Sequence, residues 1–150
     1  HDPYVSHPGY PDFKDPSYQG PISDAQGPLI KGMFAQLADR GHELILHDWR
    51  PREGFLDLCH EMDLGLQVSF SETFNIVGAD MVSQGVPLVP SVEIPWANEI
   101  FTADPTNSDD IAAKMHRALR YSRANVWLHK KQLNAYTNET IATWKRWFTT

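Results

Sequence analysis

Apolar residues follow two different spacings along the first two thirds of this chain. Three short runs are largely apolar, which is typical of buried strands, and they cover residues 43–47, 64–70 and 87–91. Elsewhere apolar positions recur every three or four residues, which predicts helices, over about residues 29–40, 52–61 and 73–84. Because strands separated by such helices pair in parallel, the pattern predicts an α/β fold with a Rossmann-like parallel sheet flanked by helices.

The last third of the chain has helical spacing only. Ser108 or Asp109 can cap a helix that continues to about Tyr121, and a long C-terminal helix follows. Apolar and aromatic side chains form a stripe along this long helix, ending in the segment 144–148. Such a stripe is typical of core packing, and the alternative is an interfacial membrane role for the same segment.

The N-terminal segment, residues 1–28, has a different composition. It contains six of the eleven prolines, interleaved with tyrosine and phenylalanine. Because proline fixes φ and removes a backbone donor, this segment is predicted to be an irregular, extended arm. The predicted organisation is therefore an arm over residues 1–28 and one α/β domain over residues 29–150. The arm docks on the domain or on a partner through its aromatic side chains, or has no function.

Composition and charge exclude several functional classes. With 13 Lys plus Arg against 19 Asp plus Glu, the net charge of −6 provides no general basic field for nucleic acid or anionic lipid. The single cysteine, Cys59, excludes an internal disulfide and a multi-cysteine metal site. Without a signal peptide or a long apolar run, we expect a cytoplasmic protein and no membrane partner. Because the sequence does not begin with Met, we also expect a fragment of a longer chain.

Two acidic residues, Glu72 and Asp80, flank the start of a predicted helix. Ligands of parallel sheets bind beyond the carboxyl ends of the strands, where the following helices begin. With Ser71 as the cap, this helix is predicted to start near Thr73, and its free backbone N–H groups can hold a phosphate. These N–H groups belong to Thr73, Phe74, Asn75 and Ile76.

The spacing of Glu72 and Asp80 limits what they can do together. Eight residues of helix rise about 12 Å, so the two carboxylates cannot form a close acid–base pair. They can bind separate hydroxyl-bearing ends of one extended ligand if Asp80 lies off the buried face of the helix. An Asp80 beneath packed side chains, or a Glu72 on the side of the sheet away from any crevice, would contradict binding of such a ligand. Alternatively, Glu72 only favours the helix N-terminus and Asp80 is a solvated charge.

The sequence around these acids resembles a known family. Asp63 opens an apolar strand, Glu72-Thr73-Phe74 follows a serine, Asp80 comes eight positions after Glu72, and Gly85-Val86-Pro87-Leu88-Val89 follows. This combination is similar to the donor-binding half of retaining GT-B-fold glycosyltransferases, the glycosyltransferase group 1 family. The resemblance covers about residues 42–100, and more loosely the C-terminal helices.

The resemblance implies a partial GT-B C-terminal domain that binds a nucleotide-diphosphate sugar as the donor for glycosyl transfer. Glu72 would contact hydroxyls of the donor sugar, and Asp80 the ribose of the nucleotide. The backbone at residues 73–76 would bind the diphosphate, and Trp49-Arg50 would border the nucleobase, although Trp49 is equally compatible with a core position. The family needs neither a metal nor another cofactor. A missing N-terminal acceptor-binding half, or a partner chain, would complete catalysis.

This sequence also departs from the family pattern. The glycine after the phenylalanine is Asn75, a residue that tolerates unusual backbone angles. The second acid is Asp80, one methylene shorter than glutamate. The upstream Arg and Lys that neutralise the diphosphate have no counterpart in residues 1–40. The alternative hypothesis is therefore a non-catalytic α/β interaction module derived from a glycosyltransferase.

Overall fold

The computed structural model describes Gly32 and residues 40–149, and the chain divides into two units, His1–Asp48 and Trp49–Thr150. The predicted arm over residues 1–28 lies outside the described residues. The predicted helix over residues 29–40 does too, except for the helical Gly32 and for residue 40, which lies in a turn.

A parallel pair of strands forms the centre of the second unit. β1 (Gly65–Gln67) pairs with β2 (Leu88–Pro90), with Gly65 opposite Leu88 and Gln67 opposite Pro90. The helix α3 (Ile76–Ser83) connects them, which is the crossover that the apolar spacing predicts. The α/β class and the parallel pairing are confirmed, with a sheet of two strands in the described part of the chain.

The predicted strand over residues 43–47 is wrong. This segment has no regular secondary structure, and the side chains of Ile45 and Leu46 are 61% and 60% exposed. A strand requires a neighbour for its backbone hydrogen bonds. In the described residues the sheet contains β1 and β2 alone, so an apolar run was not sufficient to make this segment a strand.

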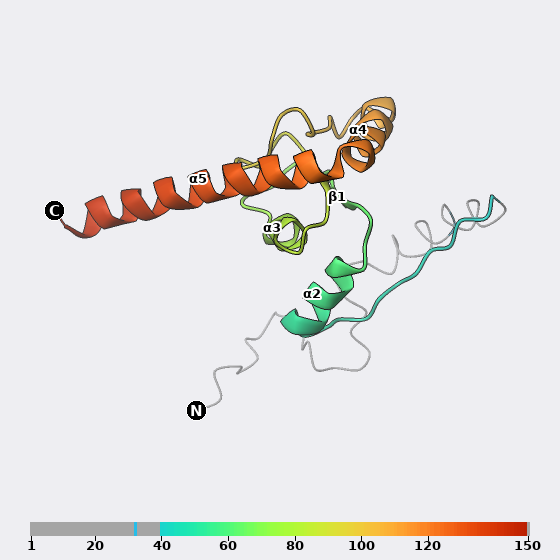
Figure 1. The fold of residues 1–150 in the computed structure, drawn as a ribbon, viewed down its shortest axis with the longest axis horizontal. Coiled ribbons are helices and arrows are strands. Elements are labelled where there is room, and N and C mark those ends of the chain that lie inside the picture. Colours follow the sequence, from blue (N-terminus) through green and yellow to red (C-terminus); the bar gives the residue numbers. More distant parts are fainter. Residues whose placement is uncertain (1–31, 33–39, 150) are drawn as a thin grey trace, which may run out of the picture. The chain divides into compact units, whose positions relative to one another are not determined.

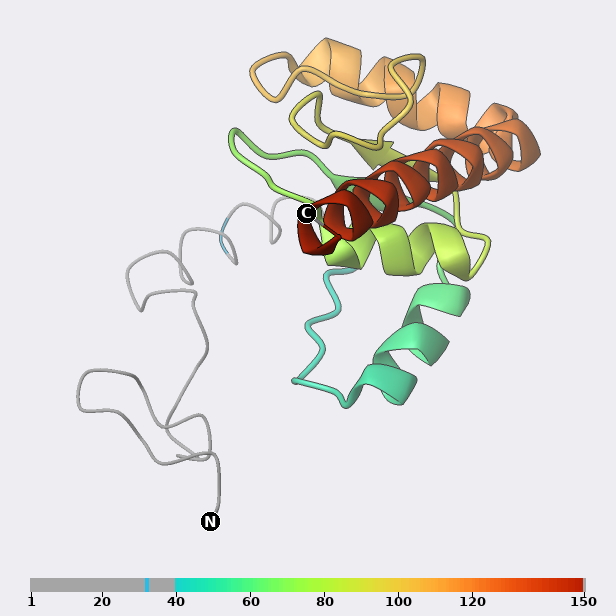
Figure 2. The same ribbon diagram turned by 90° about the vertical axis from the view of Figure 1, so that its left-hand side faces the viewer.

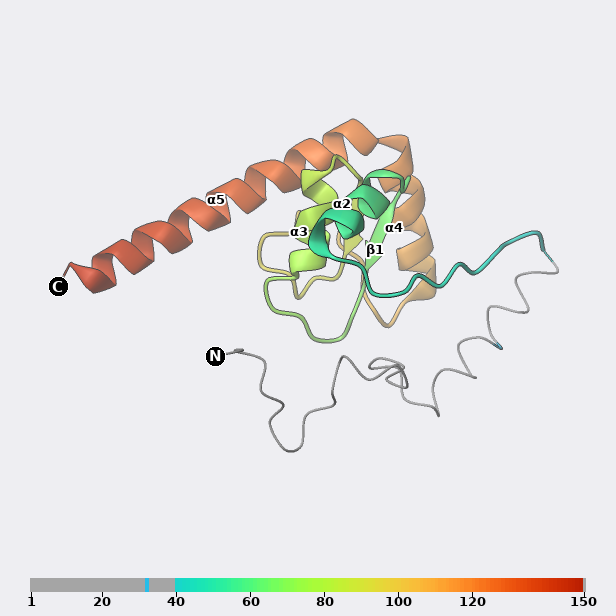
Figure 3. The same cartoon turned by 90° about the horizontal axis from the view of Figure 1, so that it is seen from below.

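Three further helices belong to the second unit. They are α2 (Arg52–His60), α4 (Ser108–Arg120) and the 27-residue α5 (Ser122–Phe148). α3 and α4 pack against the N-terminal half of α5, and its C-terminal half extends beyond them (Figures 1 and 3). The long C-terminal helix predicted from the sequence is therefore confirmed.

The two faces of β2 pack into two hydrophobic clusters, because successive side chains of a strand point to opposite faces. Leu88 packs in one cluster with Val82 and Trp96. Val89 packs in the other with Phe101 and residues of α4. The strand is fully buried between them, and this explains why it reads as a continuous apolar run.

α5 is attached to β2 by one buried amide. The Asn125 side chain accepts a hydrogen bond from the Leu88 N–H (2.8 Å) and donates one to the Leu88 carbonyl oxygen (2.9 Å). Asn125 and its neighbour on the helix, His129, have no exposed surface. This contact fixes the position of α5 along the strand.

Candidate functional site

The loop that follows β1 ends at an unusual residue, Asn75. Its φ of 55° lies in the left-handed region, where asparagine is tolerated better than most residues. Its side-chain oxygen accepts the Gly78 N–H at 2.6 Å and its side-chain nitrogen donates to Gln67 at the end of β1. Asn75 is therefore the N-cap of α3.

The prediction that Ser71 caps a helix starting near Thr73 is wrong, since α3 begins at Ile76. Thr73 and Phe74 precede the helix and contribute nothing to its first turn. The N–H of Gly78 is already bonded to Asn75, so the free N–H groups of the first turn belong to Ile76 and Val77. Fewer backbone N–H groups are therefore available to an anion than the four that the sequence predicted.

Close packing explains why Gly78 occupies this turn. A Cβ at Gly78 would lie 2.8 Å from the Asn75 side-chain oxygen and 3.1 Å from a methyl group of Leu88. Any side chain here would push α3 away from β2 or displace the cap. The glycine thus keeps the N-terminus of α3 close to the strand.

Glu72 lies in the loop between β1 and α3 and is half-buried. No described residue makes a hydrogen bond or ion pair with its carboxylate. The loop follows the carboxyl end of β1, which is where ligands of parallel sheets bind. The position of Glu72 therefore leaves its carboxylate available to a ligand.

The same loop is held from the other side by aromatic residues. The indole N–H of Trp96 donates to the Phe74 carbonyl oxygen. The centroid of the Phe74 ring lies 6.1 Å from the ring centroid of Trp96 and 6.0 Å from that of Tyr136 on α5. The loop bearing Glu72 is therefore attached both to the segment after β2 and to α5.

Asp80 forms an ion pair that the sequence did not predict. Both of its carboxylate oxygens accept from the Arg52 guanidinium, at 2.7 Å and 2.9 Å. The hydrogen bonds with Asp80, and then its negative charge, raise the pKa of Arg52 above its ordinary value. This two-point contact joins the start of α2 to α3.

The expectation that Asp80 lies off the buried face of its helix is wrong, since the residue is 7% exposed. The reason is that α3 packs against the sheet, α5 and α2 together. A helix covered on several sides has little exposed face, so helical spacing does not show which residue remains outside. Asp80 is neither a solvated charge nor an open ligand group in this structure.

Trp49 and Arg50 were predicted to border a nucleobase. Both lie just before α2 in a segment without regular secondary structure, and Trp49 is 89% exposed. The alternative of a core position for Trp49 is therefore wrong.

Two buried titratable groups lie away from Glu72. Burial lowers the pKa of His129 to about 4, against the opposing effect of its hydrogen bond with Asn125. Because the Asn125 oxygen also accepts the Leu88 N–H, the His129 Nδ1 carries the proton. Burial, and then the charge of Asp80, raise the pKa of the Cys59 thiol, so this residue is a buried thiol, in line with a core role.

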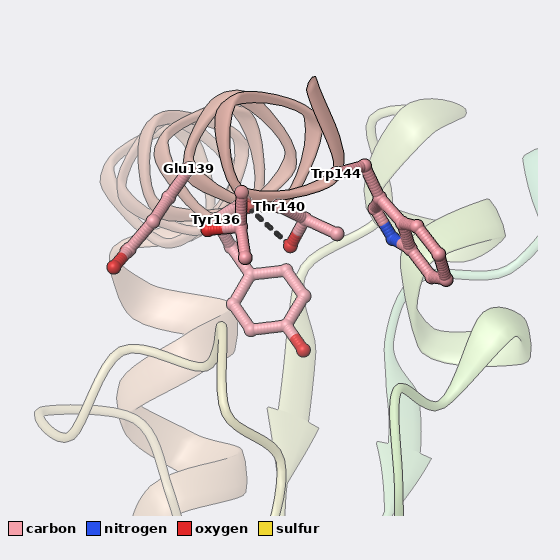
Figure 4. A pocket seen from close by; sticks show the side chains of 5 residues that line it. Tyr136, Glu139, Thr140 and Trp144 are labelled. Atoms are coloured by element: carbon pink, nitrogen blue, oxygen red, sulfur yellow. Dashed lines mark hydrogen bonds between the residues drawn. The ribbon is translucent and has the colours of Figure 1, made fainter. Parts of the chain in front are cut away.

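A shallow pocket of about 290 Å³ lies on α5. Figure 4 shows Tyr136 and Trp144 projecting from the helix with Thr140 between them, and the Thr140 hydroxyl donates to the Tyr136 carbonyl oxygen. Glu139 and Thr143 complete the lining. Since all five residues come from one helix, the pocket is a surface hollow.

Comparison with known protein families, with characterised proteins and with solved structures finds no match. Within residues 32 and 40–149, no three His, Cys, Asp or Glu side chains are grouped so that they could hold a metal ion. In the same residues, no helix is both long enough and apolar enough to cross a membrane.

Sequence reasoning missed the partners that fix the candidate site. Arg52 was noticed only as a helix start, because nothing local links it to Asp80, 28 residues away. Trp96, the donor to Phe74, also lies far along the chain, in the loop after β2. The cap at Asn75 did leave a signal, since an asparagine three residues before a glycine is compatible with an N-cap and its bonded N–H.

Proposed function

We propose that the second unit is the nucleotide-sugar-binding part of a retaining glycosyltransferase. The observation that carries this proposal is the position of Glu72. It lies in the loop at the carboxyl end of a parallel strand, its carboxylate has no partner in the described structure, and α3 begins four residues later. The sequence resemblance around Glu72 supports the same function.

The geometry matches the chemistry that such a site needs. Glu72 accepts hydrogen bonds from hydroxyl groups of the donor sugar. The free N–H groups of Ile76 and Val77, at the positive end of α3, donate to the diphosphate. Negative charge develops on the diphosphate as it leaves, so these donors stabilise the transition state. An acceptor-binding part on another segment or chain supplies the second substrate.

The attachment of the loop favours this assignment. The contacts of Phe74 with Trp96 and Tyr136 fix the segment between Glu72 and α3. A fixed loop lowers the entropy lost when a ligand binds. The left-handed Asn75 turns the chain into α3 as a glycine would, so this departure from the family pattern is compatible with the proposed function.

The buried position of Asp80 counts against the proposal, because the two acids were expected to hold one ligand together. The resemblance assigns this carboxylate to the ribose, yet Arg52 already binds both of its oxygens. The proposed function therefore depends on Glu72 and the start of α3.

A second function, an interaction module, is favoured by the C-terminal end of α5. Trp144, Trp147 and Phe148 are 58%, 76% and 79% exposed, and Trp144 stacks on Phe148. Clusters of exposed aromatic side chains are typical of surfaces that bind other proteins. In this hypothesis the α/β unit is a scaffold and α5 makes the contact.

Ligand-observed NMR titrations of the full chain separate the two functions. The probes are UDP-glucose, GDP-mannose and ADP-glucose, each compared with its nucleoside diphosphate. Because Glu72 contacts the sugar, we expect Glu72→Gln to weaken binding of one nucleotide sugar about 10-fold and to leave its diphosphate unchanged. The control is Glu61→Gln, which replaces an exposed acid at the end of α2.

Equal affinities of wild type and Glu72→Gln for the bound nucleotide sugar would contradict the role of Glu72. If the wild-type chain binds none of the six probes, the result favours the interaction module.

A further inference from the structure

The Arg52 guanidinium has donor groups to spare. Its side chain is 63% exposed, while that of Asp80 is 10% exposed. A guanidinium carries five N–H donors, and the two-point contact with Asp80 uses two of them. No other hydrogen-bond partner of Arg52 is found in the described part of the chain. The remaining donors therefore face solvent from a group whose position is fixed.

Arg52 is the first residue of α2, and the N-terminus of α2 lies on the same side of the second unit as the N-terminus of α3. The His60 Nδ1 of α2 lies 3.4 Å from the carbonyl oxygen of Gln84, just after α3, so the two helices end side by side. They have 9 and 8 residues and run in the same general direction, so their N-termini lie at one edge of the unit (Figure 2). This edge is also the carboxyl end of β1.

The first turn of α2 adds further donors. Its N-cap, Pro51, has no side chain that accepts a hydrogen bond, and the first helical bond closes at Phe55. The N–H groups of Arg52, Glu53 and Gly54 are therefore unused, and the helix dipole makes this end positive. Glu53 lies in the same turn and Asp80 pairs with Arg52, so this edge offers an anion hydrogen-bond donors, from two helix N-termini and one guanidinium, and no net positive charge.

From this arrangement we propose that Arg52 binds the diphosphate of the nucleotide sugar and that Asp80 is a positioning residue, which holds Arg52 and does not contact the ribose. The inference rests on the proposed function. Arg52 then supplies a cation for the diphosphate, a role that no residue of the segment 1–40 matches in the family pattern.

The burial of Asp80 supports this division of roles. The Asp80 side chain is only 10% exposed and both of its oxygens already accept from Arg52, so a ribose hydroxyl has little access to them, and displacing Arg52 would leave a buried charge unpaired. Holding the guanidinium by two parallel bonds fixes its plane, and planar donors suit a diphosphate. Lys114 and Arg117 donate to the Ile100 carbonyl, whereas Arg52 is bonded to a residue of α3.

The test compares binding with and without phosphate groups. Ligand-observed NMR titrations of the full chain use UDP, GDP and ADP, their nucleosides, and inorganic pyrophosphate. The main variant combines Arg52→Gln with Asp80→Asn, because two amides can bond to each other and no buried charge is left unpaired. Arg123→Gln, which replaces an exposed arginine on α5, is the matched control.

We expect the double variant to bind the preferred nucleoside diphosphate, and pyrophosphate, at least 10-fold more weakly than wild type. Its affinity for the nucleoside should be unchanged, which a loss of folding would not allow. The single variant Asp80→Asn should weaken diphosphate binding less than the double variant, because Arg52 keeps its charge and loses only its anchor.

Other results separate the inference from the proposed function. Equal diphosphate affinity in the double variant and wild type overturns the role of Arg52 and leaves the proposed function standing. Weaker nucleoside binding by Asp80→Asn overturns the positioning role of Asp80. Arg52-dependent binding of pyrophosphate without any preference for nucleoside diphosphates supports Arg52 and overturns the proposed function. If wild type binds no probe, both are overturned.

Discussion

Two polar contacts fix helices in the second unit, and they differ in exposure and charge. Asn125 joins α5 to β2 through a neutral amide with no exposed surface. Arg52 and Asp80 join α2 to α3 through charged groups, and the Arg52 side chain is mostly exposed. The Asn125 contact, called the sealed contact below, has no access to solvent. The Arg52–Asp80 contact, called the open contact, is accessible to solvent on the Arg52 side. A structural role follows for Asn125, whereas Arg52 keeps N–H donors exposed to solvent.

The largest expected effect tests the sealed contact. Asn125→Ala removes both hydrogen bonds to Leu88 and leaves its N–H and carbonyl oxygen buried without partners. Since an unsatisfied buried group costs about 1–3 kcal/mol, we expect the free energy of unfolding to fall by about 3 kcal/mol or more. Urea unfolding measures it, with Asn134→Ala as the exposed control on the same helix. A loss as small as that of the control would show that Asn125 is not an anchor.

The next effect concerns pH at the same contact. Burial lowers the pKa of His129 to about 4 in the folded protein, so as pH falls below about 6.5 the unfolded chain takes up a proton first. The stability contribution is complete above pH 6.5 and is lost progressively down to about pH 4. Between pH 7 and pH 5 we expect wild type to lose about 2 kcal/mol more than His129→Gln, measured by urea unfolding at each pH.

His116→Gln, which replaces an exposed histidine of α4, should keep the pH dependence of wild type. Identical pH dependence in wild type and His129→Gln would mean that the pKa of His129 is the same in the folded protein as in the unfolded chain.

A smaller effect is expected where α3 meets β2, near the open contact. Gly78→Ala places a methyl group 2.8 Å from the Asn75 oxygen, so we expect a loss of about 1–2 kcal/mol from the strained cap. Gly54→Ala is the matched change on α2, where the nearest atom lies 3.9 Å away, and it should stabilise by about 0.5–1 kcal/mol. Thermal unfolding that shows the same sign for both would contradict the packing argument.

The smallest effect on stability is expected at the open contact itself. Combining Arg52→Gln with Asp80→Asn keeps a hydrogen bond and removes an ion pair that is partly in solvent, where such pairs contribute little. The melting temperature should fall less than in Asn125→Ala or Gly78→Ala. A fall in melting temperature as large as that of Asn125→Ala would show that the open contact contributes as much to stability as the sealed contact does.

The sequence predicted the helices well where they pack on one side. The predicted range of residues 52–61 for α2 and the end near Tyr121 for α4 differ from the structure by one residue. In each, one apolar face meets the core, and helical spacing records that face. For α4 the cap is Asn107, one residue before Ser108 and two before Asp109, the two predicted candidates, and its oxygen accepts from two N–H groups of the first turn.

Contacts across the chain could not be predicted in this way. The start of α3 was misplaced because Ser71 resembles a cap, whereas the left-handed Asn75 depends on Gln67 and Gly78 for its bonds. The burial of Asp80 depends on α2, which no pattern within α3 reveals. The strand over residues 43–47 failed because apolar character does not provide a neighbouring strand. Glu72 lies in the loop after β1, and its role as a ligand group stays a prediction.

The amide of Asn125 has one more consequence, which concerns aggregation. On the side of β2 away from β1, it forms hydrogen bonds with both the N–H and the carbonyl oxygen of Leu88. On the same side, the Pro90 carbonyl oxygen accepts the Ala103 N–H, and proline has no N–H of its own. An approaching foreign strand would find no free backbone group there, so this side cannot template edge-to-edge polymers. Lateral growth of the sheet by recruitment of another chain is thereby confined to the opposite side, along β1.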